Sequence, residues 1–247
     1  MGKNKLKKFA EMETYNHVFQ ATFADLGKKD FHMKGNWNAD FFKNDNPVVL
    51  ELGCGKGEYA VALARLFPEK NFIGVDIKGS RMHSGATDAK SEGLTNVAFI
   101  RTNIESITSF FEKGEVSGIW LTFPDPQMKK SRKRLTSTRF LKLYEDILVD
   151  NGLIHLKTDS NFMHTYTREL LNTNNITPEV DEVDLYASGF SEDILSIQTY
   201  YESKWLAHGL PIKYIRFRVP NNKELTEPDV EIDFDDYHSA GRSVKKR

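Results

Sequence analysis

The segment "FPDPQMKKSRKRL" places a carboxylate directly before a run of cations. Because proline fixes its own φ angle and restricts the residue before it, Asp125, which lies between two prolines, is held on a stiff backbone and can be aimed at a ligand. The basic residues that follow it predict that this ligand carries phosphates. They are Lys129, Lys130, Arg132, Lys133 and Arg134.

The second candidate site is the glycine-rich segment "ELGCGKGEY". Gly53, Gly55 and Gly57 follow an apolar run typical of a buried strand and precede a helical pattern, so a ligand can lie against bare backbone N–H groups near a helix N-terminus. The spacing differs from the dinucleotide-binding fingerprint and from the phosphate-binding loop. Glu51 adds a carboxylate, which would repel a pyrophosphate and attract a cation such as the sulfonium or ammonium group of S-adenosylmethionine. Cys54, within the loop, is expected only to fill space.

Two more polar residues end neighbouring predicted strands. Asp76, in "GVDIKGSRM", stands where an acidic side chain accepts hydrogen bonds from both ribose hydroxyls of an adenosyl group. Asn103 closes the next strand and is placed to contact the edge of an adenine. Each feature alone is weak evidence, since a glycine-rich turn is often only a turn and an acid that ends a strand is often only a helix cap. In open α/β sheets, however, ligands bind beyond the carboxyl ends of the strands, so all of these side chains are expected to converge on one site.

Apolar runs and helical patterns alternate along the chain, which predicts βαβ units and a mostly parallel sheet covered on both faces. A weak helical pattern occupies residues 15–26. The predicted strands are 47–52, 71–77, 96–102, 118–123, 152–158, 179–185 and 213–219, and the predicted helices lie near 60–67, 80–92, 138–149 and 162–171.

Composition and charge restrict the class of protein. Hydrophobic residues make up 39% of the 247 residues and charged residues 28%, as in globular proteins. No apolar run is long enough to span a membrane, the N-terminal segment lacks an apolar signal core, and the single cysteine fits a reducing compartment, so we expect a cytoplasmic protein. The histidines lack ligand spacing, and no metal site is expected. The net charge of −1 hides basic clusters at 3–8, 129–134 and 242–247, which predict a local cationic face.

From about Leu50 to Phe217 the sequence resembles the bacterial tRNA (guanine-N7)-methyltransferases. Five motifs match in order: "ELGCGKGEY", "FIGVDIKGSRM", "FPDP" with paired lysines, "LKTDSNFM" and "TYYESKWLAHGLPI". The first two occur in many class I methyltransferases, whereas the last three are far more specific. The resemblance implies a Rossmann-like class I methyltransferase fold of about seven mostly parallel strands. It also implies transfer of a methyl group from S-adenosylmethionine to N7 of guanine 46 in the tRNA variable loop.

Carried over position by position, the resemblance assigns contacts with the cofactor and with tRNA. The cofactor contacts fall on Glu51, Asp76, Asn103 and Asp125. The tRNA contacts fall on Lys129, Asp159, Thr199, Tyr200, Tyr201 and Glu202. The family usually has Trp-Pro where this sequence has Gln127 and Met128, so a stacking surface for a base is missing here.

N7 of guanine has an in-plane lone pair and no proton, so catalysis is expected to rest on positioning and on a negative group near the charge that forms on the ring. Asp125 fits that role, and Asp159 and Glu202 are expected to help recognise the guanine edge. The basic run would bind phosphates. Two alternatives stay open: another class I RNA methyltransferase, and an RNA-binding protein of this fold without activity.

The expected organisation is one domain with two extensions. Residues 1–45 are predicted as a partly helical N-terminal extension with a basic start, 46–220 as the methyltransferase domain, and 221–247 as an acidic and then basic tail. We expect tRNA as the partner, no obligatory protein partner, and a monomer or homodimer.

Overall fold

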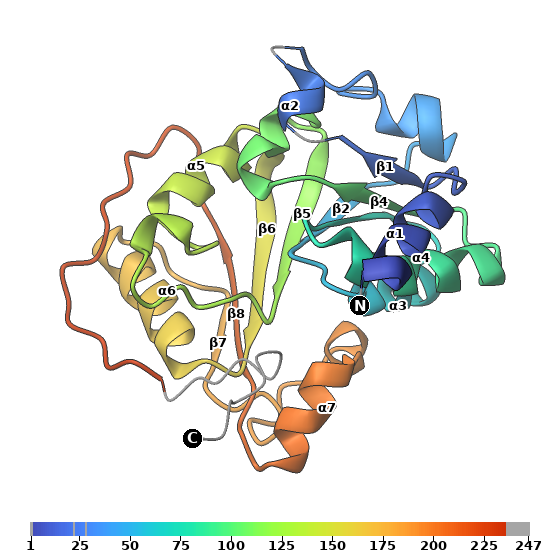
Figure 1. Cartoon of the computed structure of the whole chain (residues 1–247). Coiled ribbons are helices and arrows are strands. Elements are labelled where there is room, and N and C mark those ends of the chain that lie inside the picture. The colour runs from blue at the N-terminus through green and yellow to red at the C-terminus, as the bar shows by residue number, and fades with distance from the viewer. Residues whose placement is uncertain (1, 22, 28, 236–247) are drawn as a thin grey trace.

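The computed structural model describes residues 2–21, 23–27 and 29–235, which form one eight-stranded sheet with helices packed against it (Figure 1). The strand order is β1-β4-β3-β2-β5-β6-β8-β7, and every pairing is parallel except those of β8 with β6 and β7. The strands are β1 (Val18–Gln20), β2 (Val48–Leu52), β3 (Asn71–Val75), β4 (Val97–Arg101), β5 (Val116–Thr122), β6 (Leu148–Thr158), β7 (Val180–Glu182) and β8 (Lys213–Arg218).

Helices cover both faces of this sheet. The α-helices are α1 (Gly2–Met12), α2 (Phe23–Leu26), α3 (Glu58–Leu66), α4 (Gly79–Glu92), α5 (Thr138–Glu145), α6 (Asn161–Thr173) and α7 (Tyr200–Ala207). Four short helices complete the set: a π-helix η1 (Trp37–Phe42) and the 3-10 helices η2 (Ile104–Ser109), η3 (Ser131–Lys133) and η4 (Asp193–Ser196). One apolar core lies under α3 and α4, and the other lies under η1, α5 and α6.

The alternation of side chains along each strand explains the two cores. In β5, Trp120 belongs to the core under α3, whereas its neighbours Ile119 and Leu121 belong to the core under α5. All five residues of β3 are buried, as expected for a parallel strand that is covered on both faces. The predicted α/β fold is therefore confirmed, with eight strands rather than about seven.

The weak helical pattern over residues 15–26 matches a helix only at its end, where α2 begins at Phe23. Between α1 and α2 lies the short strand β1. This strand pairs in parallel with β4, and His17 O also accepts a hydrogen bond from Phe99 N (2.8 Å). Three residues are too few to show a strand period, and the partner strand is far away in the sequence. The helix predicted over 138–149 also ends early, at Glu145, because β6 begins at Leu148.

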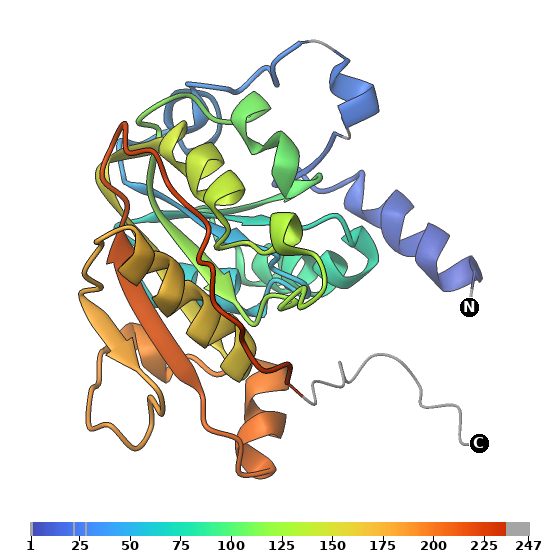
Figure 2. The ribbon, with the colours of Figure 1, turned by 90° about the vertical axis from the view of Figure 1, so that its left-hand side faces the viewer.

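The acidic segment 221–235 lies along α5 and α6 (Figure 2). Glu227 accepts hydrogen bonds from Thr138 N (2.9 Å) at the start of α5 and from the Tyr166 hydroxyl (2.5 Å) of α6. Asp235 accepts from Phe162 N (2.9 Å) and from the Ser160 hydroxyl at the start of α6. Acidic side chains at helix N-termini are stabilising, so this segment caps two helices. The basic residues 242–247 lie outside the described residues.

We expect Glu227→Ala to lower the free energy of unfolding by about 1 kcal/mol, the usual value of a lost N-terminal cap. Urea denaturation measures this change. Asp229→Ala, which removes an exposed acid of the same segment, serves as the control and is expected to have a much smaller effect. Equal stabilities of the two variants would contradict the capping role.

Candidate active site

A cavity of about 570 Å³ opens beyond the carboxyl ends of β2, β3 and β5. Its volume is in the range of small-molecule sites. The sheet side is formed by the glycine loop, Asp76 and the segment that contains Asp125, and the opposite wall by Thr199, Tyr201 and Trp205. A smaller cavity of about 150 Å³ shares Gly53 and Asp76 with it and includes Asn103. The structure thus brings most of the predicted cofactor residues together.

The glycine loop joins β2 to α3. Gly53, Gly55 and Gly57 have φ angles of 82°, 55° and 74°, in the left-handed region that favours glycine. Gly53 and Gly55 line the cavity, but Gly57 does not. A Cβ atom at Gly57 would lie 2.5 Å from the Phe99 ring, so this glycine permits close packing of the loop on β4. Gly57 therefore serves the packing beneath the loop, and its direct contact with the cofactor stays a prediction.

Glu51 lies in β2, beneath the glycine loop, and its side chain is buried. It accepts hydrogen bonds from Ala60 N (2.9 Å) and from the Thr122 hydroxyl (2.5 Å). Burial raises the pKa of Glu51 to about 8, despite these two hydrogen bonds, which lower it. The carboxyl is therefore mostly protonated at pH 7 in this structure, contrary to the charged group expected from the sequence. A cation in the cavity would favour the ionised form.

This shift in the Glu51 pKa makes stability depend on pH. In the unfolded chain the carboxyl titrates near 4.5, and in the folded protein near 8, so between these values the folded state holds the extra proton. Stability therefore falls as pH rises from about 4.5 to about 8. We expect Glu51→Gln to remove roughly 2 kcal/mol or more of this decline, measured by urea denaturation from pH 5 to pH 8. Parallel pH curves for variant and wild type would contradict the raised pKa.

Asp76 and Asn103 lie at the ends of β3 and β4. The Asp76 carboxylate accepts hydrogen bonds from Gly55 N (2.9 Å) and Lys78 N (2.7 Å), so it fixes the glycine loop while it faces both cavities. Asn103 lines the smaller cavity beside Thr102. Among the described residues, the buried Thr102 Oγ1 has no hydrogen-bond partner. A buried polar atom without a partner beside a cavity fits a ligand with a polar edge, such as adenine.

The segment that presents Asp125 is shaped by more than its prolines. Phe123 and Gln127, on either side of it, have φ angles of 49° and 47°, which are unfavourable for residues with a side chain and are common at functional sites. Asp125 Oδ1 accepts a hydrogen bond from Gln127 N (3.1 Å), and the side chain is exposed at the cavity. The carboxylate is therefore both oriented and accessible.

Arg134 holds the far end of this segment. Its guanidinium donates to the carbonyls of Met128 (2.9 Å) and Gln127 (3.4 Å) and lies over the rings of Tyr166 (4.3 Å) and Phe162 (4.7 Å). The sequence predicted a phosphate contact for Arg134. These contacts give Arg134 a structural role in holding the segment, and its phosphate contact stays a prediction.

The other predicted cations remain on the surface around the cavity. Lys129, Lys130 and Arg132 are exposed, and Lys133 lines both cavities while it pairs with Glu105 (3.6 Å). Three further cations that line the cavity were not predicted from the sequence, although they follow β2 and β3 and the rule of strand ends applies to them. These are Lys56, Lys78 and Arg81.

The opposite wall comes from α7 and the residues before it. Thr199 caps α7 by accepting a hydrogen bond from Glu202 N (3.2 Å). Tyr200 does not line the cavity; its backbone N–H donates to Glu58 (3.0 Å), and its ring lies 4.0 Å from Lys56 Nζ. The glycine loop and the start of α7 are therefore directly linked.

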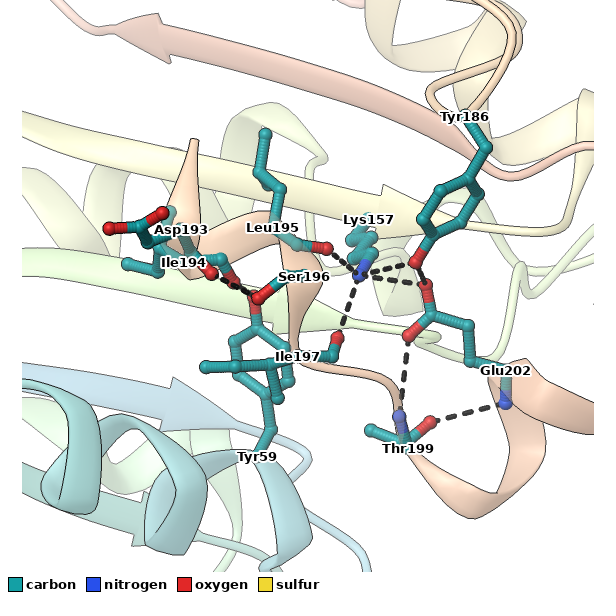
Figure 3. Close-up of polar contacts among 10 residues, drawn as sticks. All are labelled: Tyr59, Lys157, Tyr186, Asp193, Ile194, Leu195, Ser196, Ile197, Thr199 and Glu202. Atoms are coloured by element: carbon teal, nitrogen blue, oxygen red, sulfur yellow. Dashed lines mark hydrogen bonds and ion pairs between the residues drawn. The ribbon is translucent and has the colours of Figure 1, made fainter. Parts of the chain in front are cut away.

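Two predicted tRNA contacts have unexpected surroundings. Glu202 is completely buried, with Oε1 2.7 Å from Lys157 Nζ, so a direct contact with guanine would require breaking this ion pair (Figure 3). Asp159 is partly exposed and does not line the cavity, and burial raises its pKa to about 6. The surroundings of Glu202 are determined by Lys157 of β6, and those of Asp159 by the residues that bury it.

The described residues contain no group of His, Cys, Asp and Glu side chains arranged to hold a metal ion. His155, for example, stacks on Trp120 and hydrogen-bonds to the Tyr214 hydroxyl (2.8 Å), and burial lowers its pKa to about 3. Within the same part of the chain, no helix is both long and apolar enough to cross a membrane.

Solved structures share the fold at low sequence identity. The 16S rRNA methyltransferase KamB has a TM-score of 0.58 at 13% identity, with 78% of this chain and 97% of that chain covered. The 16S rRNA (adenine(1408)-N(1))-methyltransferase from Catenulisporales acidiphilia, solved with SAM, has a TM-score of 0.53 at 14% identity, with 81% and 97% covered. These similarities confirm the Rossmann-like class I methyltransferase fold.

Sequence comparisons are far closer. Residues 45–215 match a family model described as a putative methyltransferase. A tRNA (guanine-N(7)-)-methyltransferase from Bacteroides fragilis is 59% identical over 245 residues, which cover 99% of this chain and 97% of the relative. One of the same name from Porphyromonas gingivalis is 55% identical over 240 residues, covering 96% and 98%. The chain belongs to the family of tRNA (guanine-N7)-methyltransferases.

Proposed function

We propose that this protein transfers a methyl group from S-adenosylmethionine to N7 of guanine 46 in the variable loop of tRNA. The observation that carries the proposal is the single cavity that unites the glycine loop, Asp76 and Asp125 in a chain of this family. Exposed cations of the segment 129–133 stand beside it, as a tRNA substrate requires.

The residues around the two cavities fit S-adenosylmethionine, which when bound supplies an electrophilic methyl group on its sulfonium. Gly53 and Gly55 have no side chain to keep the ligand away from the backbone of the loop, and Asp76 has lone pairs left for the ribose hydroxyls. Asn103 and Thr102 fit the adenine edge in the smaller cavity. Glu51 gains negative charge as a cation approaches it.

The proposed chemistry needs no proton acceptor, because N7 carries a free lone pair. Asp125 accepts hydrogen bonds from the guanine N–H groups, which orients N7 toward the methyl group, and its charge stabilises the cation that forms on the ring. The exposed lysines bind phosphates and set the register of the tRNA without reading its sequence.

A direct experiment tests the proposed function. Purified protein is incubated with tRNA and labelled S-adenosylmethionine, and the modified nucleoside is mapped by nuclease digestion and mass spectrometry. We expect 7-methylguanosine at position 46 and no product on a tRNA that carries adenosine there. Methylation of another base would favour another class I RNA methyltransferase, and cofactor binding without any product would favour a binding protein. The intact glycine loop and Asp76 already argue against the latter.

We expect the double variant Lys130→Ala/Arg132→Ala to bind tRNA more weakly and with a flatter salt dependence. With fewer phosphate contacts, binding releases fewer counterions from the tRNA. The slope of log affinity against log salt should fall by about one per lost contact. Affinity for S-adenosylmethionine should not change.

The matched control for this test is Lys43→Ala/Lys113→Ala. Both lysines are exposed and precede strands, so they lie at the edge of the sheet away from the cavity. If the control pair changed the slope as much as the test pair, the basic segment would have no special role in binding tRNA.

We also propose that the protein acts in the cytoplasm as a monomer or homodimer, without an obligatory protein partner. The free Cys54 fits a reducing compartment, and the tRNA in the names of the relatives supports the cytoplasmic location. Full activity of the purified chain on tRNA would support it, and a need for a second protein would contradict it.

A further inference from the structure

Lys157, near the end of β6, is buried beside the candidate active site and takes no part in the chemistry proposed above. Its side chain is 0% exposed. Removing an ammonium group from water costs several kcal/mol unless partners replace the water. Burial accordingly lowers the pKa of Lys157, and the neighbouring Glu202 opposes that shift. Because burying the Lys157 ammonium costs free energy, we looked for what its contacts hold in place.

The Lys157 ammonium is surrounded by oxygens (Figure 3). It lies 2.7 Å from Glu202 Oε1 and donates to the carbonyls of Leu195 (3.1 Å) and Ile197 (3.0 Å). The Tyr186 hydroxyl, 3.4 Å from Nζ, donates to the same Glu202 oxygen (2.6 Å). One lysine therefore binds both ends of the segment 195–202.

The bound segment forms a wall of the larger cavity. It runs from η4 into α7 and contains Thr199 and Tyr201, and Trp205 follows one turn later. Glu202 continues the connection, because its second oxygen accepts a hydrogen bond from Thr199 N (3.3 Å). A continuous series of contacts therefore leads from Lys157 through Glu202 to Thr199, which lines the cavity.

Apolar packing of Leu195 and Ile197 on the core under α3 anchors one end of the segment, and polar contacts define the rest of its course. No strand pairing is present between η4 and α7, and among these contacts the Ile194 carbonyl accepts from the Tyr59 hydroxyl (3.0 Å) of α3. An apolar side chain could fill the volume of Lys157 but could not bind two carbonyls in fixed directions. Buried ion pairs often contribute little to stability while they favour one conformation.

We propose that Lys157 is a positioning residue which, with Glu202, holds the segment 195–202 in the conformation that completes the cofactor cavity. The proposal rests on the proposed function, because it assigns S-adenosylmethionine to that cavity. Lys157 acts through Thr199, Tyr201 and Trp205 and touches neither substrate.

The main test removes both charges together, because Lys157→Met alone leaves Glu202 buried without its cation and can prevent folding. In Lys157→Met/Glu202→Gln, glutamine still supports the helix cap while the two carbonyls lose their donor. We expect this double variant to fold and to bind S-adenosylmethionine at least tenfold more weakly by calorimetry.

A control variant makes the test specific. Arg65→Met/Glu92→Gln removes an ion pair between α3 and α4 that does not line the cavity, and its cofactor affinity should not change.

Limited proteolysis supplies a readout of conformation. Cleavage after Tyr200, Tyr201 and Lys204 should be faster in Lys157→Met/Glu202→Gln than in wild type, and cofactor should slow it less. A folded double variant with wild-type cofactor affinity and wild-type cleavage would overturn the positioning role and leave the proposed function intact. A wild-type protein that does not bind S-adenosylmethionine would instead overturn the proposed function.

Discussion

Asp125→Asn is expected to slow methyl transfer by about a hundredfold or more, as when other preorganised electrostatic groups are removed. Asparagine keeps the size of the side chain and an oxygen for Gln127 N, so the segment should retain its shape. The negative charge near the guanine ring is lost. The measurement is the single-turnover rate with tRNA and S-adenosylmethionine both saturating. A rate within a few fold of the wild type would mean that the Asp125 charge does not act on the transition state.

The pH dependence of the same rate separates charge stabilisation from proton removal. Because N7 has no proton to lose, the wild-type rate should level off once Asp125 is ionised and should not rise again near neutrality. Glu51 and Asp159 have pKa values of about 8 and 6, so either carboxyl can add a step of its own. A step that disappears in Glu51→Gln belongs to Glu51. A rise that disappears only in Asp125→Asn would indicate proton transfer, and N7 would then be the wrong target atom.

The position of the site was predictable because it depends on a rule of topology. Parallel strands end at one edge of the sheet, so residues that directly follow apolar runs meet there, whatever separates them in sequence. Asp76 and Asp125 were found in this way and line one cavity. The same rule applied to every residue after a strand would have added Lys56 and Arg81, which were overlooked because only the run 129–134 is dense in charge.

What the sequence did not reveal depends on contacts between remote elements. Glu202 was expected to face guanine because its neighbours carry a family motif, but its surroundings are set by Lys157 on another strand. Arg134 belongs to a basic run, yet the rings of α6 lie beneath it. A single sequence gives the type of each charged side chain but not the partner that neutralises it.

Backbone geometry was a further limit. Prolines on both sides of Asp125 predicted a stiff segment, but not that Phe123 and Gln127 would adopt left-handed conformations. Bulky residues rarely take such φ angles, so no propensity predicts them. Phe123 follows directly after the end of β5, and Arg134 holds the carbonyls of Gln127 and Met128, so contacts outside the segment fix the path of the chain.

Asp76→Ala is expected to weaken binding of S-adenosylmethionine roughly tenfold to a hundredfold. A hydrogen bond to a charged acceptor contributes about 1.5–3 kcal/mol, which corresponds to that range of affinity. Affinity for tRNA should stay nearly unchanged, since Asp76 is placed to meet the ribose. Calorimetry on the purified variant measures both quantities, and unchanged cofactor affinity would refute the assignment.

A second ligand distinguishes the two ways in which Asp76 can act, because its carboxylate also fixes Gly55 N and Lys78 N. The ligand is an analogue of S-adenosylhomocysteine without the ribose hydroxyls. If Asp76 binds those hydroxyls, wild type should prefer S-adenosylhomocysteine over the analogue, and Asp76→Ala should bind both with similar affinity. If Asp76 acts only by fixing the glycine loop, the variant should lose the same factor for both ligands. The first pattern places the carboxylate in contact with the cofactor, and the second confines it to the support of the loop.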